Sequence, residues 1–230
     1  MRYREHDGIR MSEIGIGCYG LSGAYGEVDV AAYKATLRRA YELGVTVFDA
    51  AEAYGDAEAI LGEVVRPFRD EVLVATKVGV REGLEPNLSA GYVTDACEAS
   101  LQRLGMETID LYQVHVDDPD TPVAETVGAL EDLVRAGKIR RYGVGHLPLP
   151  RVRQYMDGGD VFSVLMEFSA AARGAREHLL PLCEERDVAA IAFSVTGRGL
   201  LTGRYAEGHA FPDGDIRQID PLFQRERFRS

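Results

Sequence analysis

The sequence is poor in cysteine and in positive charge, and each shortage excludes a class of protein. Its 230 residues contain three cysteines, Cys18, Cys97 and Cys183, far apart and odd in number. They support neither a disulfide framework nor a paired-cysteine metal site, so we expect reduced thiols. Lysine and arginine total 26 against 37 acidic residues, which gives a net charge of −11. We therefore expect no nucleic-acid partner, because a phosphate backbone is bound by a positive surface.

The sequence also lacks a long apolar run. No uninterrupted stretch is long enough to span a bilayer, and residues 1–7 contain no apolar signal core. These absences predict a soluble cytoplasmic protein without a membrane partner. A small-molecule substrate is the expected ligand.

Short β-branched runs alternate with helical patterns along residues 1–205. This alternation is typical of βαβ units around a parallel sheet, and the length and the 46% hydrophobic content suit one α/β domain. Seven parallel strands are predicted at 14–17, 45–49, 72–76, 109–114, 142–144, 161–165 and 189–193. Helices are predicted at 30–43, 56–65, 90–104, 123–136, 151–156 and 175–185.

Residues 206–230 break the pattern and predict an irregular C-terminal tail. Gly208, Pro212, Gly214 and Pro221 interrupt the segment, and no eighth buried strand is visible. A seven-stranded barrel would leave the edges of its first and last strands unpaired, and such edges need cover. We therefore expect a homo-oligomer whose interface includes the tail. Its scattered apolar residues could pack as anchors: Phe211, Ile219, Leu222, Phe223 and Phe228.

Four polar residues lie at or just after the ends of predicted strands: Asp49, Tyr54, Lys77 and His115. In a parallel barrel these ends converge on one mouth, where the chemistry is done. An isolated tyrosine titrates near pH ~10, but an adjacent ammonium lowers its pKa. We expect Lys77 to act so on Tyr54, Asp49 to hold Lys77 by an ion pair, and His115 to bond a substrate oxygen or share the proton. The alternative is that each is an ordinary polar residue at a strand end.

Six segments together resemble the aldo-keto reductase family. In order, they are FDAAEAYG at 48–55, ATKV at 75–78, LQRLG at 101–105, DLYQVH at 110–115, GKIR at 137–140 and GLLTGRY at 199–205. The resemblance implies a TIM-barrel-like (β/α) barrel, here incomplete, and carbonyl reduction with a nicotinamide cofactor, usually NADPH. It also implies roles for the four residues: Tyr54 as proton donor, Lys77 and Asp49 as its tuning pair, and His115 as the orienting group.

The cofactor side of the resemblance is altered. Gly145 and His146 stand where the family has a Ser-Asn pair for the nicotinamide amide, and Leu165 stands where it has a glutamine. Phe193 keeps the ring-stacking aromatic. Leucine makes no hydrogen bond, and an unsatisfied buried group costs about 1–3 kcal/mol. We therefore expect no cofactor, although these residues would also suit tolerated variants in a fragment of a longer reductase.

Other residues near the strand ends suggest a substrate pocket. Cys18 and Tyr19 follow the first strand and are expected to line it together with His146 and Phe193. A run of three acidic residues after His115 could bind a metal, but without histidine spacing it fits a solvated loop and helix cap better, so no metal site is expected. Those residues are Asp117, Asp118 and Asp120.

The leading hypothesis is an enzyme of lyase or isomerase type that performs cofactor-independent acid–base chemistry on a small carbonyl or hydroxyl compound. Dehydration, elimination, isomerisation and cyclisation all need an acid or base beside an oxygen whose charge changes. The first alternative is an NADPH-dependent carbonyl reductase. The second is a catalytically silent binding module.

Overall fold

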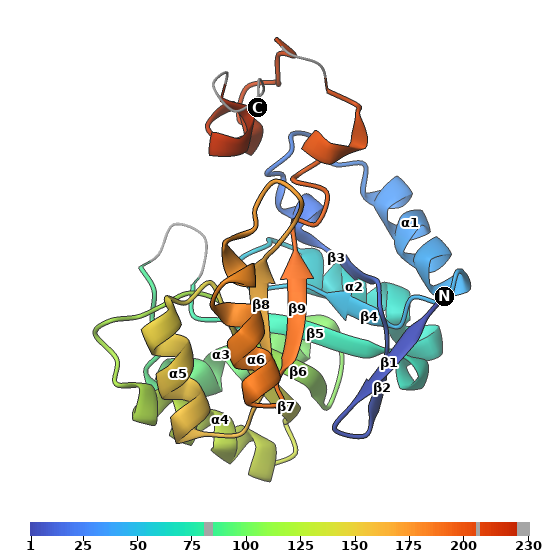
Figure 1. Cartoon of the computed structure of the whole chain (residues 1–230). Coiled ribbons are helices and arrows are strands. Elements are labelled where there is room, and N and C mark those ends of the chain that lie inside the picture. Colours follow the sequence, from blue (N-terminus) through green and yellow to red (C-terminus); the bar gives the residue numbers. More distant parts are fainter. Residues whose placement is uncertain (81–84, 206–207, 225–230) are drawn as a thin grey trace.

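The computed structural model describes residues 1–80, 85–205 and 208–224, and a curled sheet of seven parallel strands is its centre (Figure 1). Neighbours in the sheet are also neighbours in the chain, which confirms the predicted fold class. The strands are β3 (Gly15–Gly17), β4 (Val47–Asp49), β5 (Leu73–Val78), β6 (Ile109–Val114), β7 (Ile139–Gly145), β8 (Val161–Glu167) and β9 (Ala189–Phe193).

Six helices follow the strands and pack on the outside of the sheet (Figure 1). Their apolar faces and the outward-facing strand residues, such as Phe48, Val74 and Tyr112, form the larger core. The helices are α1 (Val30–Glu42), α2 (Ala57–Val65), α3 (Ala90–Leu104), α4 (Val123–Arg135), α5 (Leu149–Gly158) and α6 (Leu179–Glu185). The last helix begins later than predicted because Gly174–Arg176 forms a separate 3₁₀ turn.

An antiparallel hairpin that the sequence analysis missed precedes the barrel strands. Strands β1 (Tyr3–His6) and β2 (Ile9–Ser12) are joined by Asp7 and Gly8, both with positive φ. Asp-Gly is a strong hairpin signal, so the sequence did contain the clue. Ile9 and Met11 pack against a second core cluster of Leu73, Ala75, Leu111 and Phe162 inside the barrel. The hairpin thus closes the floor, where the strands begin.

The inner face of β5 shows how the barrel changes from floor to mouth. Leu73 and Ala75 belong to the inner cluster, whereas Val74 between them belongs to the outer core. Because side chains alternate along a strand, Lys77 shares the inner face with Leu73 and Ala75. The inner surface is therefore apolar at the floor and polar near the ends of the strands.

Residues 208–224 lie against loops at the mouth end of the barrel. The Ile216 amide donates to the carbonyl of Ala24, 2.8 Å away, in the loop after β3. Arg198, after β9, pairs with Asp220 at 2.7 Å and with Glu167, at the end of β8, at 3.2 Å. Ile219 remains 79% exposed. The expected anchor Phe228 lies outside the described residues, and the homo-oligomer remains a prediction.

Candidate functional site

Asp49, Tyr54, Lys77 and His115 meet at the mouth, and we call them the proton-transfer centre. The Lys77 ammonium donates to Asp49 Oδ2 at 2.5 Å and to the carbonyl of Ala50 at 2.6 Å. Its nitrogen lies 5.0 Å from the centroid of the Tyr54 ring. The Tyr54 hydroxyl lies 3.3 Å from His115 Nε2. The Lys77 side chain is only 2% exposed, whereas that of Asp49 is 27% exposed.

Neighbouring elements position these groups. Asp49 is the last residue of β4, Lys77 belongs to β5, and the amide of His115 continues the β5–β6 ladder by donating to the carbonyl of Val78. Tyr54 lies in a tight turn before α2, in which its amide bonds the carbonyl of Ala51. Three adjacent strand ends and one turn therefore bring the four side chains together.

Burial decides the protonation state of Tyr54. It raises the pKa of the phenol, and the charge of Asp49 raises it further. The net shift is opposite to the one expected from Lys77 alone, because burial and the charge of Asp49, which pairs with Lys77, outweigh the ammonium. Tyr54 is thus a neutral phenol near neutral pH, suited to donate a proton.

His115 is neutral for a similar reason. Burial, then the charge of Lys77 and the neighbouring His146, lower its pKa to about 3. A neutral imidazole has one donor and one acceptor nitrogen. At Nε2 it can therefore accept from Tyr54, or donate to a substrate oxygen, without carrying charge.

The structure adds Gln113, which the sequence analysis did not single out. It lies on β6 two residues before His115, and its Nε2 donates to Asp49 Oδ1 at 3.3 Å. The side chain is 1% exposed. Its polar side chain between Tyr112 and Val114, near the end of the strand, was the available signal.

Cys18 and Tyr19 lie beside the centre, and their place in a substrate pocket stays a prediction. The amide of Cys18 donates to the carbonyl of Asp49, and the Tyr19 ring meets the Tyr54 ring edge-on at 5.1 Å. Burial, followed by the charge of Asp49, raises the pKa of the Cys18 thiol to about 12. The thiol therefore stays protonated and is a poor nucleophile.

The four residues of the altered cofactor side also come together. Gly145, His146, Leu165 and Phe193 line a cavity of about 160 Å³, which Val152 of α5 and Leu179 of α6 also border. The His146 ring stacks on Phe193 with centroids 4.5 Å apart and lies 5.6 Å from the His115 ring. A Cβ on Gly145 would come within 3.1 Å of Leu165, so these two residues pack closely.

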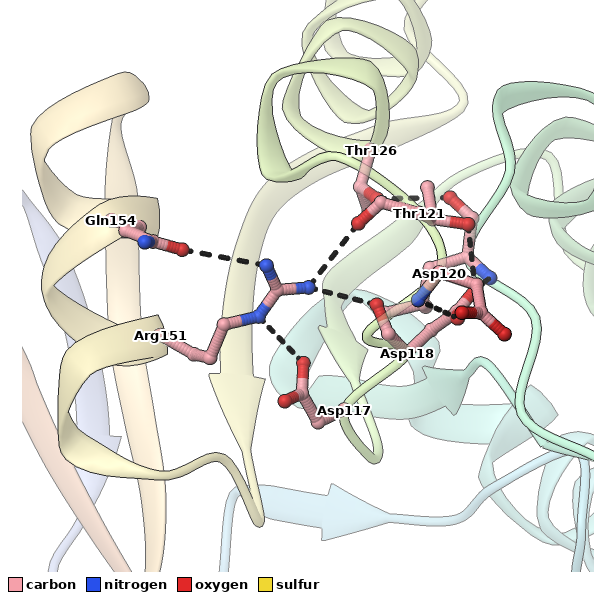
Figure 2. Close-up of polar contacts among 8 residues, drawn as sticks. Asp117, Asp118, Asp120, Thr121, Thr126, Arg151 and Gln154 are labelled. Atoms are coloured by element: carbon pink, nitrogen blue, oxygen red, sulfur yellow. Dashed lines mark hydrogen bonds and ion pairs between the residues drawn. The ribbon is translucent and has the colours of Figure 1, made fainter.

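The acidic loop after His115 is an anchor for neighbouring loops (Figure 2). Asp118 accepts from the amides of Leu88 and Asp120 and from the Thr121 hydroxyl. Arg151 on α5 pairs with Asp117 at 2.7 Å and donates to the carbonyl of Asp118. Over residues 1–80, 85–205 and 208–224, no group of three or more histidine, cysteine or acidic side chains is placed to hold a metal ion. These contacts hold the segment that carries His115.

Comparisons with known proteins point to one family. The model of the Aldo/keto reductase family matches residues 13–221. Aldo-keto reductase YhdN of Bacillus subtilis (strain 168) is 32% identical over 96% of this chain and 70% of its own length. Glycerol dehydrogenase AKR11B4 from Gluconobacter oxydans superposes with a TM-score of 0.88 at 28% identity, over 99% of this chain and 73% of that one. An aldo/keto reductase from Klebsiella pneumoniae in complex with NADP and acetate gives 0.71 at 29% identity, over 89% and 71%.

No helix in the described part of the chain is both long and apolar enough to cross a membrane.

Proposed function

Since this chain belongs to the aldo/keto reductase family, we propose that it is an NADP-dependent oxidoreductase that interconverts a small carbonyl compound and its alcohol. The comparisons favour this alternative over cofactor-independent acid–base chemistry, which they do not support, and over a silent binding module. One observation carries the proposal. A buried neutral phenol, Tyr54, lies beside a neutral imidazole and a buried ammonium that is paired with a partly exposed carboxylate.

The residues at the mouth fit the flat nicotinamide ring. His146 stacks on the half-buried Phe193, and this contact supports the inference that an aromatic face is present there for a planar ring. The exposed imidazole of His146 also has nitrogen atoms that can bond an amide. The Leu165 side chain has no such nitrogen, so His146 and Phe193 would make the contacts to the nicotinamide at this part of the mouth.

The bound cofactor would supply the hydride that the chain itself lacks. Tyr54 would donate its proton to the carbonyl oxygen as negative charge develops there. His115 would hold that oxygen by a hydrogen bond from Nε2, and the Lys77 ammonium, held in place by Asp49, would stabilise the phenolate left behind. In the reverse direction the same phenolate would accept the alcohol proton.

The proposal is tested by titrating the purified protein with NADPH and NADP⁺ while following nicotinamide fluorescence. We expect saturable binding, and consumption of NADPH when small aldehydes and ketones are added. His146→Ala should weaken binding, because it removes both the ring and its nitrogen atoms, whereas His178→Ala at the start of α6 should not. Absence of NADPH binding at millimolar concentration would contradict the proposal and favour cofactor-independent catalysis.

A further inference from the structure

Gln113 and Lys77 hold opposite oxygens of the same carboxylate. The Gln113 amide bonds Asp49 Oδ1, while Lys77 bonds Oδ2. Lys77 and Gln113 are paired neighbours in the β5–β6 ladder, so both side chains approach Asp49 from the barrel interior. With a separate donor on each oxygen, the plane of the carboxylate is fixed.

Charge determines which end of the Gln113 amide faces Asp49. An ionised carboxylate only accepts hydrogen bonds, so the NH₂ group must point to it and Oε1 must point away. Oε1 is buried and has no hydrogen-bond partner within the described chain. A buried acceptor without a partner lowers the ratio of folded to unfolded protein about 10-fold or more, unless a water molecule donates a hydrogen bond to it.

Ser163 provides a second buried polar atom on the same side. Ser163 is 0% exposed, and its Oγ also lacks a hydrogen-bond partner among the described residues. Gln113 and Ser163 are the two ladder neighbours of Gly143, on β6 and β8. A Cβ at Gly143 would collide with Ser163 Oγ and lie 3.5 Å from Gln113 Cγ, so both side chains lie against the bare backbone of Gly143.

We propose that Gln113 is a positioning residue, which holds the Asp49 carboxylate towards Lys77, and that its own carbonyl is held by a buried water shared with Ser163. The water donates to Gln113 Oε1 and accepts from the Ser163 hydroxyl. This inference rests on the proposed function, because Asp49 matters to catalysis only through Lys77 and Tyr54. Without Gln113, the partly exposed Asp49 can turn towards solvent, and the Lys77 ammonium is no longer neutralised.

The kinetic test compares Gln113→Met, which keeps the size but not the amide, with Ser163→Ala. The control is Gln102→Met, the same change at an exposed position of α3. In carbonyl reduction we expect Gln113→Met to lower kcat about tenfold, the scale of one lost bond to a charged group, without changing the KM for NADPH. The decline of the rate at high pH should move to lower pH, because an unneutralised ammonium lowers the pKa of Tyr54. Ser163→Ala should shift the profile the same way by less, and Gln102→Met should not shift it.

Wild-type kcat and an unshifted pH profile in Gln113→Met would overturn the positioning role. If Gln113→Met does not fold, the pH profile of Ser163→Ala tests the proposal in its place, since this substitution removes only the hydroxyl that holds the water. Crystal structures give a readout that needs no activity: a bridging water in the wild type, and in Gln113→Met a rotation of Asp49 away from Lys77. Absence of the water, or an unmoved Asp49, would overturn the proposal. If NADPH does not bind the wild type, the proposed function fails, and these structures still judge the hydrogen bonds.

Discussion

Tyr54→Phe separates the chemical role of Tyr54 from its packing. The ring is buried and contacts Tyr19 and Lys77 through its faces and edges, and phenylalanine keeps these contacts. The substitution removes one hydrogen bond, to His115, whose 3.3 Å length is at the long end of the range. We therefore expect a loss of at most about 1 kcal/mol in the free energy of unfolding. The loss of the donated proton should lower kcat about 100- to 10,000-fold.

The assay combines urea unfolding, NADPH binding and initial rates of carbonyl reduction. Tyr3→Phe is the matched control, because the Tyr3 hydroxyl also makes one bond, to the carbonyl of Gly44 at 3.0 Å, but lies in the floor hairpin. It should cost similar stability and leave kcat unchanged. Full turnover by Tyr54→Phe would refute the reasoning and make His146 the next candidate donor.

The pH dependence of the wild type follows from the same burial. Because burial raises the pKa of Tyr54, the phenol keeps its proton at and above pH ~10, where a free tyrosine would lose half of it. The rate of carbonyl reduction should therefore show no decline from loss of this proton below pH ~10. A fall in kcat centred near pH 7 to 8, absent from the cofactor-binding curve, would contradict this assignment.

Three further outcomes are expected. His115 has a pKa of about 3 in the folded protein and ~6.5 in the unfolded chain, so between these pH values only the unfolded chain binds a proton at His115. The free energy of unfolding, measured by urea titration, should therefore fall as the pH is lowered through this range in the wild type but not in His115→Asn. All three cysteines are buried with raised pKa values, so a thiol reagent at pH 8 should label none in the native protein and all in guanidinium; rapid native labelling would contradict the packing. Arg151→Met should lower the free energy of unfolding by about 1–3 kcal/mol, because Asp117 and two carbonyls lose a partly buried donor. The control Arg153→Met, at an exposed position of the same helix, should change this free energy by less than about 0.5 kcal/mol.

The barrel strands could be predicted from the sequence because each is a short apolar run between helical patterns. The positions of Asp49, Lys77 and His115 followed, since a parallel sheet brings strand ends to one edge. The pKa of Tyr54 could not be predicted, because it depends on burial and on the balance between the opposite charges of Asp49 and Lys77. Those quantities come from three-dimensional packing.

Two other features needed the fold for different reasons. The sequence predicts only that Asp118 is an acidic residue in a loop, and the arrangement of the loops brings it to the amide of Leu88, thirty residues away. The proposal of an NADP cofactor rests on the relatives rather than on single positions. Gly145 and Leu165 pack against each other, so their departure from the family pattern describes local packing and does not by itself exclude a dinucleotide.

The contacts of residues 208–224 have a consequence for the order in which parts of the mouth form during synthesis of the chain. In a chain made from its N-terminus, Asp49, Tyr54, Lys77 and His115 are all made before residues 208–224. The bond from Ile216 to Ala24 and the pairing of Arg198 with Asp220 must wait for roughly 100 more residues, about 5–20 seconds of translation. The residues of the proton-transfer centre are therefore made well before the segment that bonds the loop after β3, so the mouth gains these contacts late in synthesis.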